Sequence, residues 1–403
     1  MSLTLQPGKS RARLLRAPAS RSSVHMPFSL KHARVVLPDG VRTVSIVVRD
    51  GVIHKIDAVH AATARRIDCD GDYLLPGLIE PHTDNFERHL EPRPGTFWSA
   101  DRAVLAHDAE LASAGITTAL DAITVGGDLG SGAREHVYLD AISSLETAEM
   151  DGLLRIEHHL HLRCELTHPL LSRQLEAALA RRAPRLVSLM NHAPGQGQWT
   201  DVERFRAYYA RRYGMSPEEI EVLIARRQAA RAEFAAPNRE LVLEIARQHH
   251  CVLASHDDST VQDVTAARGC ECSIAEFPTS VEAAREARRV GMRVVAGAPN
   301  LVRGVSHSGN VAAADLAREE LIDILSSDYC PSSLLHAVFI LQRSFDVPLH
   351  RAVAMVSAIP ARALGLHDRG SIEEGKRADL VRVRETLRGP VIVSVWSAGR
   401  QVA

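Results

Sequence analysis

Apolar runs and helical stretches alternate through the middle of the chain, roughly over residues 77–366. Such alternation predicts a parallel α/β fold, and about 250 residues is a common size for a (β/α)8 barrel. The chemistry of these barrels lies at the carboxyl ends of the strands, so residues at the strand ends are the candidates for a functional site. We expect the strands to end near His82, Ala122, Glu165, His192, His256, Phe277, Pro299 and Asp328.

The first apolar run, residues 74–79, leads into His82 and Asp84. Residues two apart on an extended strand point the same way, so an imidazole and a carboxylate face one point, as two metal ligands would. The two residues could instead cap a strand-to-helix turn, which is a common role for them. The pair therefore predicts a metal site only together with further ligands.

Four polar side chains share one face of the strand that we expect over residues 155–166, namely His159, His161, Arg163 and Glu165. The other face is mostly apolar, which favours a barrel strand with a polar inner face over a solvated edge strand. Further apolar runs end at His192, His256 and Asp328. A single histidine at a strand end is usually structural, but two that each close a buried run fit neutral imidazole ligands.

These positions give one set of candidate ligands. Nitrogen and oxygen ligands without thiolate suit zinc, with manganese or iron as alternatives. Two such ions could activate a water molecule and stabilise a leaving group. The predicted ligands are His82, Asp84, Glu165, His192, His256 and Asp328.

The two ends of the chain predict a second, smaller domain. Short strands separated by glycine turns over residues 31–76 and 367–403 indicate a β-sandwich built from both termini. The barrel would then cover residues 77–366, with a helical insertion near 195–247 that could act as a lid. Residues 1–30 are expected to be a disordered leader or an over-called start, with Met26 as another start, rather than a mitochondrial transit peptide.

Composition narrows the class of protein. The net charge of −1 argues against a broad basic surface for nucleic acid, and no apolar run approaches the length of a membrane span. The six cysteines are scattered, so we expect reduced thiols and a cytoplasmic enzyme. We also expect a homo-oligomer, a dimer.

Residues 76–82, Pro-Gly-Leu-Ile-Glu-Pro-His, resemble the first barrel strand of the amidohydrolase superfamily, metal-dependent hydrolases on a distorted (β/α)8 barrel. That resemblance implies two metal ions and makes Asp328 both a ligand and the acceptor of the proton from the attacking water. The superfamily usually places its two late histidines on strands five and six, whereas our count puts His192 and His256 on strands four and five. This difference puts our numbering of the strands in question more than the identity of the predicted ligands.

Residues 82–89, His-Thr-Asp-Asn-Phe-Glu-Arg-His, resemble a narrower family, the alpha-D-ribose 1-methylphosphonate 5-triphosphate diphosphatases of the carbon–phosphorus lyase pathway. Later motifs add to this resemblance, including Ser-His-Asp-Asp at 255–258 and Ser-Asp-Tyr-Cys-Pro at 327–331. The resemblance implies hydrolysis of the triphosphate to the 5-phosphate and pyrophosphate in phosphonate catabolism. The residues alone predict only a metal-dependent hydrolase.

Many amidohydrolases bridge their two metal ions with a carboxylated lysine. Between Lys55 and Lys376 this chain contains no lysine, so under the barrel interpretation the bridge must be an Asp or a Glu. We expect Glu165 to take this role.

Arginine and histidine in the loops at the strand ends are the candidates for binding a triphosphate. Arginine forks bind phosphate oxygens through paired hydrogen bonds, and the late loops of a barrel often build phosphate sites. The candidates are Arg88, His89, Arg93, Arg163, Arg303 and His307. Two other functions stay open, which are another amidohydrolase, such as a deaminase or cyclic amidase, and a non-catalytic scaffold.

Overall fold

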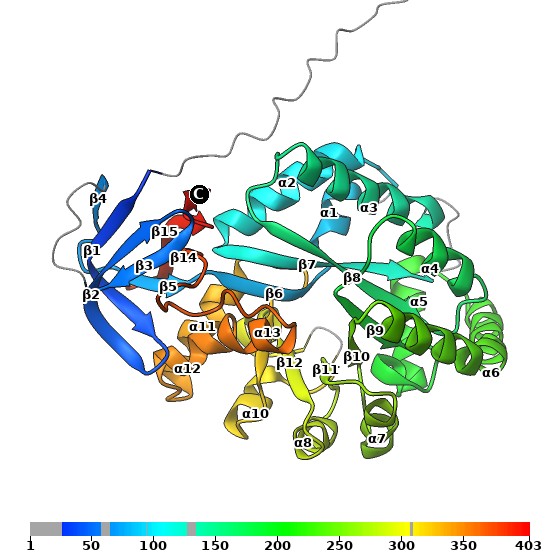
Figure 1. Cartoon of the computed structure of the whole chain (residues 1–403). Coiled ribbons are helices and arrows are strands. Elements are labelled where there is room, and N and C mark those ends of the chain that lie inside the picture. The colour runs from blue at the N-terminus through cyan, green and yellow to red at the C-terminus, as the bar shows by residue number, and fades with distance from the viewer. Residues whose placement is uncertain (1–25, 58–64, 94, 127–133, 307–308) are drawn as a thin grey trace, which may run out of the picture.

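The computed structural model describes residues 26–57, 65–93, 95–126, 134–306 and 309–403. Two eight-stranded sheets organise this part of the chain. One sheet is the parallel barrel, and the other lies beside it and combines strands from both ends of the sequence (Figure 1). Residues 1–25 of the predicted leader lie outside the described residues, and the first strand already begins at Phe28.

The barrel strands follow one another in chain order around the sheet, and each pair of neighbours is parallel. A parallel bridge between Thr83 and Asp328 joins the last strand to the first, so the barrel is nearly closed. The eight strands are β6 (Leu78–Thr83), β7 (Ile116–Val125), β8 (Glu157–Glu165), β9 (Leu186–Met190), β10 (Val252–His256), β11 (Ile274–Glu276), β12 (Arg293–Gly297) and β13 (Ile324–Ser326).

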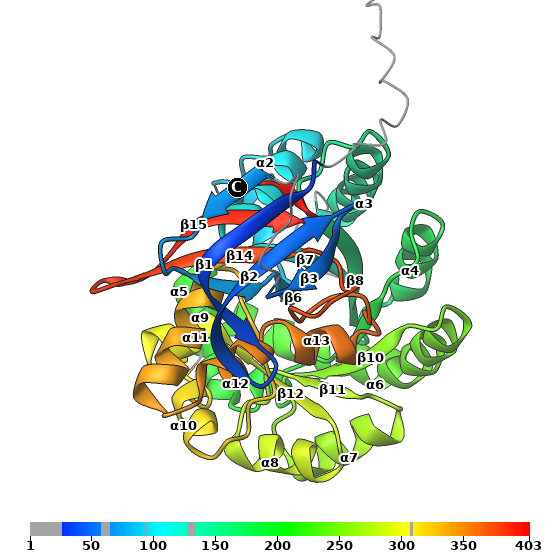
Figure 2. The same cartoon turned by 60° about the vertical axis from the view of Figure 1, so that its left-hand side comes forward.

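Helices surround this barrel and cover its outer face, as Figure 2 shows from a second direction. Apolar side chains between helices and strands form the largest core of the molecule. The helices are α1 (Asn85–Leu90), α2 (Ala100–Ser113), α3 (Arg134–Met150), α4 (Leu171–Leu179), α5 (Val202–Tyr213), α6 (Pro217–Gln248), α7 (Val261–Gly269), α8 (Val281–Arg289), α9 (Ala298–Arg303), α10 (Ala313–Arg318), α11 (Ser333–Ser344), α12 (Leu349–Ala354) and α13 (Ala358–Ala363).

A separate apolar layer seals the inside of the barrel below the functional residues. It includes Ala254 and Ile274, and Leu364 after α13 packs against the same cluster. Side chains two residues apart on a strand share a face, so the next inward residues after Ala254 and Ile274 are His256 and Glu276. The period of the strands thus places polar side chains directly above an apolar floor.

The second sheet has the order β16-β15-β14-β5-β1-β2-β3, with β4 paired to β1. Most of its pairs are antiparallel, and Phe28 stacks on Trp396 with ring centroids 5.9 Å apart, which joins the two ends of the chain. The strands are β1 (Phe28–Leu37), β2 (Gly40–Arg49), β3 (Val52–Ile56), β4 (Arg65–Asp68), β5 (Tyr73–Pro76), β14 (Leu380–Thr386), β15 (Gly389–Ser397) and β16 (Arg400–Gln401). The predicted fold class, a barrel with a small β domain from both termini, is confirmed.

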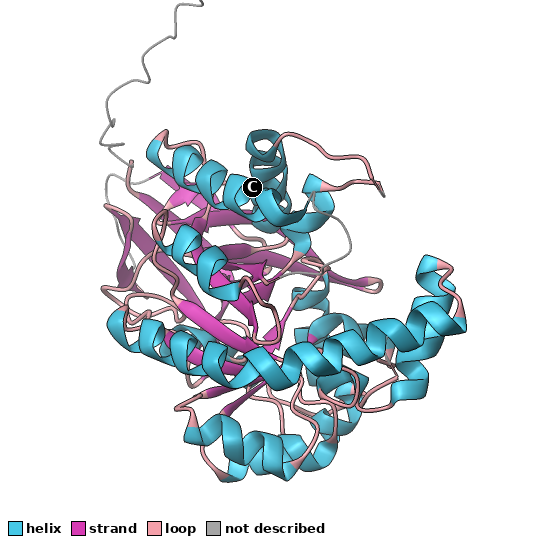
Figure 3. Cartoon of the chain, turned by 90° about the vertical axis from the view of Figure 1, so that its right-hand side faces the viewer, coloured by secondary structure: helices cyan, strands magenta, loops and turns pink. Residues whose placement is uncertain are grey.

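Between β9 and β10 the chain forms the short helix η1 (Gly197–Trp199), then α5 and α6. Figure 3 shows α6 as the long helix along one side of the barrel. Ser216 and Glu219 cap its start reciprocally, which satisfies amides that the first turn leaves unpaired. Asn238 of α6 donates to the carbonyls of Leu166 and His168, at 2.8 and 3.0 Å, and so attaches the helix to the loop after β8.

Candidate metal centre

The carboxyl ends of the barrel strands surround a cavity, which we call the metal lobe. His82, Asp84, His256, Asp257 and Asp328 line it, at or just after the ends of β6, β10 and β13. The sequence predicted four of these five residues as ligands. Parallel strands bring their carboxyl ends to one edge, which explains why residues so far apart in the sequence meet here.

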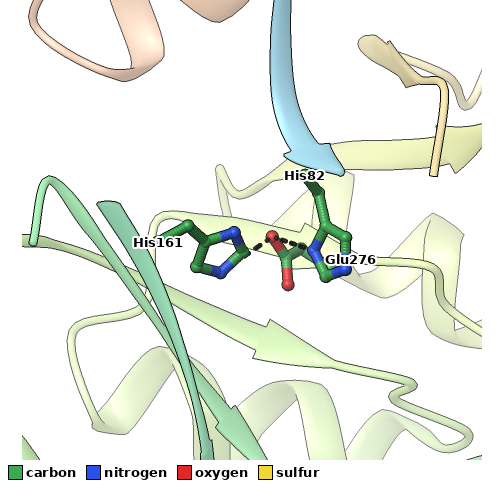
Figure 4. A group of neighbouring side chains, drawn as sticks. All are labelled: His82, His161 and Glu276. Atoms are coloured by element: carbon green, nitrogen blue, oxygen red, sulfur yellow. Dashed lines mark ion pairs between the residues drawn. The ribbon is translucent and has the colours of Figure 1, made fainter. Parts of the chain in front are cut away.

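A buried carboxylate at the end of β11 lies between two imidazoles of this centre. Glu276 Oε1 is 3.1 Å from His82 Nδ1 and 3.7 Å from His161 Nε2, and Figure 4 shows the carboxylate between the two rings. Its other oxygen lies 3.1 Å from His256 Nδ1 and accepts a 2.7 Å hydrogen bond from Ser188. Although burial favours the neutral acid, His82, His161 and His256 hold the pKa of Glu276 well below its usual range. Glu276 is therefore ionised and fixes the orientation of the histidines.

The imidazoles of His192 and His256 converge on Asp257. The Nε2 atoms of both rings lie 3.6 Å from Asp257 Oδ2, and their Nδ1 atoms face Glu165 and Glu276 respectively. Burial lowers the pKa of His192, but Asp257 and Glu165 outweigh it and raise the pKa to about 9. The carboxylates that favour a proton on His192 also favour a metal ion beside it.

Glu165 accepts from His192 Nδ1 at 2.9 Å and from the hydroxyl of Thr167 at 2.6 Å. In this arrangement Glu165 orients His192, while Asp257 Oδ2 lies between the two imidazoles. The bridging role of Glu165 stays a prediction, and Asp257 is a second candidate for it.

Asp328 follows β13 among several other carboxylates. Burial raises the pKa of Asp328 well above its usual range, and the nearby charge of Asp84 raises it further. The positive charge of Arg163, whose guanidinium lies 3.7 Å from Asp84, opposes this effect. A site so rich in carboxylates attracts a cation.

A second buried acid holds Asp328 in place from below. Glu80 accepts from the hydroxyl of Ser326 at 2.7 Å and from the backbone amides of His82 and Ser327. Burial raises the pKa of Glu80 to about 7 against these hydrogen bonds. Thr83 donates to the carbonyl of Asp328 at 2.9 Å, so the closing edge of the barrel positions both His82 and Asp328.

The backbone just after three strands adopts the left-handed conformation that non-glycine residues rarely take. The φ angles are +58° at Asp257, +52° at Phe277 and +53° at Asp328. Each such residue costs on the order of 1–3 kcal/mol, and such conformations persist where the surrounding structure holds them, often at active sites. Three together at the mouth of one barrel indicate that side-chain direction is maintained there at the expense of stability.

The polar atoms of this centre fit a metal site. Several buried atoms here make no hydrogen bond of good geometry within the described residues, among them His161 Nδ1, His192 Nε2 and the ion-paired atoms His82 Nδ1 and Glu276 Oε1. Two groups of three potential ligands gather here, His82 with His161 and Glu276, and His192 with His256 and Asp257. Buried imidazole and carboxylate atoms without a well-aligned hydrogen bond are costly unless something binds them, and nitrogen and oxygen donors suit a divalent metal ion.

The residues predicted to bind substrate divide into three sets. Arg163 and Arg303 line the metal lobe. Arg88 and His89 pair with Glu110 at 2.6 and 2.8 Å, and Arg93 is exposed on the following loop. His307 lies outside the described residues.

Three residues of the centre were missing from the predicted ligand set, namely His161, Asp257 and Glu276. His161 shares the polar face of its strand with Glu165, and Asp257 directly follows a predicted ligand. Glu276 ends the sixth barrel strand, so an acid stands where a late histidine was expected from the superfamily. The strand count was right, because His192 follows the fourth barrel strand and His256 ends the fifth.

Comparisons with known proteins agree with this architecture. Residues 73–402 match the family described as Amidohydrolase family. The chain belongs to the amidohydrolase family. It is 42% identical over 375 residues to alpha-D-ribose 1-methylphosphonate 5-triphosphate diphosphatase of Escherichia coli K12, covering 93% of this chain and 99% of that protein. The prediction of a hydrolase of this superfamily is confirmed.

Other amidohydrolases match more weakly. An allantoinase of Streptomyces avermitilis is 37% identical over 98 residues, 23% of this chain and 20% of that protein. Among solved structures, N-acetylglucosamine-6-phosphate deacetylase from Pasteurella multocida superposes with a TM-score of 0.59 at 13% identity, covering 93% of this chain and 99% of that one. The 5-methylcytosine deaminase from Klebsiella pneumoniae gives 0.60 at 14% identity, covering 93% and 98%. These structures support the fold alone.

Members of the amidohydrolase family generally use a divalent metal centre, and the His, Asp and Glu groups at the barrel mouth fit one. All six cysteines are free. Within the described residues, we find no helix with the length and apolar character of a membrane span.

Proposed function

We propose that this chain hydrolyses alpha-D-ribose 1-methylphosphonate 5-triphosphate to the 5-phosphate and pyrophosphate, in the cytoplasm and as a dimer. The full-length similarity to the Escherichia coli diphosphatase carries the choice of substrate. The barrel mouth supports the reaction class, because its metal lobe combines clustered ligands with Arg163 and Arg303.

His82, Asp84, Glu165, His192, His256 and Asp328 are the residues that we expect to hold two divalent ions, with Asp257 as a further ligand. Zinc is our first choice, with manganese or iron as alternatives. Such ions, when bound, polarise a phosphoryl oxygen, lower the pKa of water and neutralise charge on a leaving group.

Asp328 accepts the proton of the attacking water in this proposal. Its carboxylate lines the metal lobe, and the Glu80 network below it limits its movement. A carboxylate in the same cavity as the other predicted ligands lies within reach of a water bound there, so it can accept the proton of that water as a general base.

Arg163 and Arg303 bind the phosphate chain in this proposal. Arg163 lies between Asp84 and His256, where a phosphoryl group near the ligands would meet its guanidinium. Arg303 ends α9, and Asn300 and Asn310 line the lobe beside it. Donors on this side would hold the β and γ phosphates, so the α–β bond would lie over the metal ligands. This placement favours the release of pyrophosphate in one step over removal of the terminal phosphate.

Phosphorus NMR in oxygen-18 water tests the proposal with the purified, metal-loaded enzyme. We expect pyrophosphate as the first product and the label on the sugar 5-phosphate. Orthophosphate as first product, or label in pyrophosphate, would place the attack elsewhere. Hydrolysis of hydantoins or deamination of purines, without any reaction of the triphosphate, would assign the chain to another amidohydrolase activity.

A further inference from the structure

A second cavity, which we call the aromatic lobe, adjoins the metal lobe. Glu165 and His192 form its barrel side, and Trp199, Tyr208 and Tyr213 form the opposite side. Arg163 and Gln198 line both cavities, so the two lobes meet at these side chains. The site is thus elongated, with the predicted metal ligands between two different environments.

The inserted segment supplies the rings of the aromatic lobe. Phe205, Tyr209 and Tyr213 are spaced four residues apart on α5 and therefore share one face of the helix, with ring centroids 4.4 and 5.3 Å apart. Trp199 contacts Tyr208 with centroids 5.1 Å apart. Phe205 is fully buried, whereas Tyr208 and Tyr213 are 40% and 54% exposed. The cluster therefore has a buried base and an accessible aromatic surface beside the metal centre.

Arg227 of α6 completes this lobe. Its guanidinium lies 5.2 Å from the ring centroid of Tyr209 and 5.5 Å from that of Phe205, within the range of cation–π attraction. Its side chain is half-buried and lines the cavity. Adjacent charged residues on a helix, such as Arg226 and Arg227, are usually expected to be solvated. Arg226 is exposed, as expected, but Arg227 lies against the rings.

We infer that the aromatic lobe binds the ribosyl methylphosphonate end of the substrate, an inference that rests on the proposed function. The substrate has a polyanionic chain at one end and a sugar with a singly charged methylphosphonate ester at the other. Arg303, Asn300 and Asn310 suit the phosphate chain on the metal-lobe side. The sugar's C–H face and the methyl group then pack on the aromatic rings, and Arg227 meets the phosphonate oxygens.

This assignment explains why a hydrolase for a sugar triphosphate carries so many aromatic side chains beside its metal ligands. Triphosphates are common, so a site that bound only the phosphate chain would not discriminate among them. A polar contact made only with the phosphonate provides discrimination, because its loss leaves the charged partner without a ligand. Arg227 is thus a specificity-determining residue.

Kinetics with two substrates test this inference. The wild type should prefer the full substrate over ribose 5-triphosphate, which lacks the methylphosphonate. In Arg227→Met, which keeps most of the apolar stem, this preference in kcat/KM should fall about 10- to 100-fold, the usual effect of losing a charged hydrogen bond. Arg226→Met is the matched control and should keep the wild-type preference.

Binding provides a readout that does not depend on turnover. The product, alpha-D-ribose 1-methylphosphonate 5-phosphate, should change the fluorescence of Trp199, and Trp199→Phe should remove that change. Inorganic tripolyphosphate should bind without it. Circular dichroism and the Tm show whether Arg227→Met remains folded. If the lost preference in Arg227→Met comes from the lost charge, Arg227→Lys, which keeps a positive charge, should recover part of the preference.

The outcomes separate the two proposals. An equal loss of kcat/KM on both substrates in Arg227→Met, or an unchanged preference, would overturn the inference while leaving the proposed function standing. Faster hydrolysis of a nucleoside triphosphate than of the full substrate would identify the aromatic lobe as a nucleobase site. That result would also overturn the inference. Failure of the wild type to hydrolyse the full substrate would contradict the proposed function itself.

Discussion

The barrel carries two buried groups of histidine and acid, and they differ in how their polar atoms are satisfied. At the mouth, several buried atoms make no hydrogen bond of good geometry within the described residues, His161 Nδ1 and His192 Nε2 among them. The second group, which we call the His–Asp network, consists of His107 and Asp108 on α2, Asp121 on β7 and His158 on β8. All four of its side chains are buried.

Every ring nitrogen of the His–Asp network has a partner. His107 Nε2 and His158 Nδ1 each lie 2.8 Å from a different oxygen of Asp121. His158 Nε2 faces Asp108 at 3.3 Å, and His107 Nδ1 faces the side-chain amide of Asn85 at 3.3 Å. Asp108 also accepts from the backbone amides of Arg155 and Ile156.

The comparison teaches that residue type alone does not identify a metal site. Both groups bring two histidines and an acid close enough to be considered ligands. In the His–Asp network, protons already satisfy the acids, and the group joins α2 to the barrel strands. At the mouth, buried atoms without a well-aligned hydrogen bond and an excess of carboxylates favour binding of a cation. Substitutions in the His–Asp network and in the metal centre can each test this distinction.

The largest expected effect is on stability, in the His–Asp network. His158→Phe should lower the free energy of unfolding by about 3–5 kcal/mol, because Asp121 and Asp108 lose their buried cationic partner. The metal content of the folded protein should not change. Urea unfolding and elemental analysis measure the two quantities, with His54→Phe at an exposed position as the control. Loss of metal in His158→Phe would erase the distinction between the groups.

The next effect is on catalysis, at the mouth. Asp328→Asn keeps the size of the side chain but removes its basicity, so kcat should fall by roughly 100-fold or more, which is about 2.7 kcal/mol. The matched change Asp121→Asn should reduce stability and leave the kcat of folded enzyme within a few-fold of wild type. An Asp328→Asn enzyme that retains metal and full activity would assign the base to another residue.

A more gradual effect, small over any one pH unit, concerns the pH dependence of stability. Burial lowers the pKa of His158, but Asp121 and Asp108 outweigh it and raise the pKa to about 10. Because the folded pKa exceeds the unfolded value, the stabilisation is complete below about pH 6.5 and is lost as the pH rises toward 10. Over that window the free energy of unfolding should decrease by about 1.4 kcal/mol per pH unit from this group. Urea titrations at several pH values should show a smaller slope in His158→Gln, and equal slopes would mean that His158 is neutral.

The sequence predicted the barrel well because each strand is an apolar run that ends in a recognisable residue. His82, Asp84, His256 and Asp328 line one cavity at the barrel mouth, since strand periodicity and parallel pairing determine where they meet, and their role as ligands stays a prediction. Glu276 was missed because its strand is only three residues long, too short for periodicity to mark its inward face. The roles of the loop arginines were harder to predict from the sequence. Arg88 pairs with Glu110 on α2, and no local pattern predicts a partner 22 residues away.

The His–Asp network could not be predicted from the chain. Its members come from a helix and two strands, and none of them stands in a motif that suggests chemistry. A buried histidine on a helix and another on the outer face of a strand are compatible with ordinary packing. Only tertiary contacts show that they share Asp121.

Anomalous diffraction from crystals of the wild-type protein grown with zinc tests the central distinction most directly. We expect metal peaks at the barrel mouth, within reach of His82, His192 and His256, and none among His107, Asp121 and His158. Glu165→Ala should weaken or abolish a peak at the mouth, since this side chain either binds the metal or orients His192. A metal peak in the His–Asp network, or a barrel mouth without any, would contradict the account.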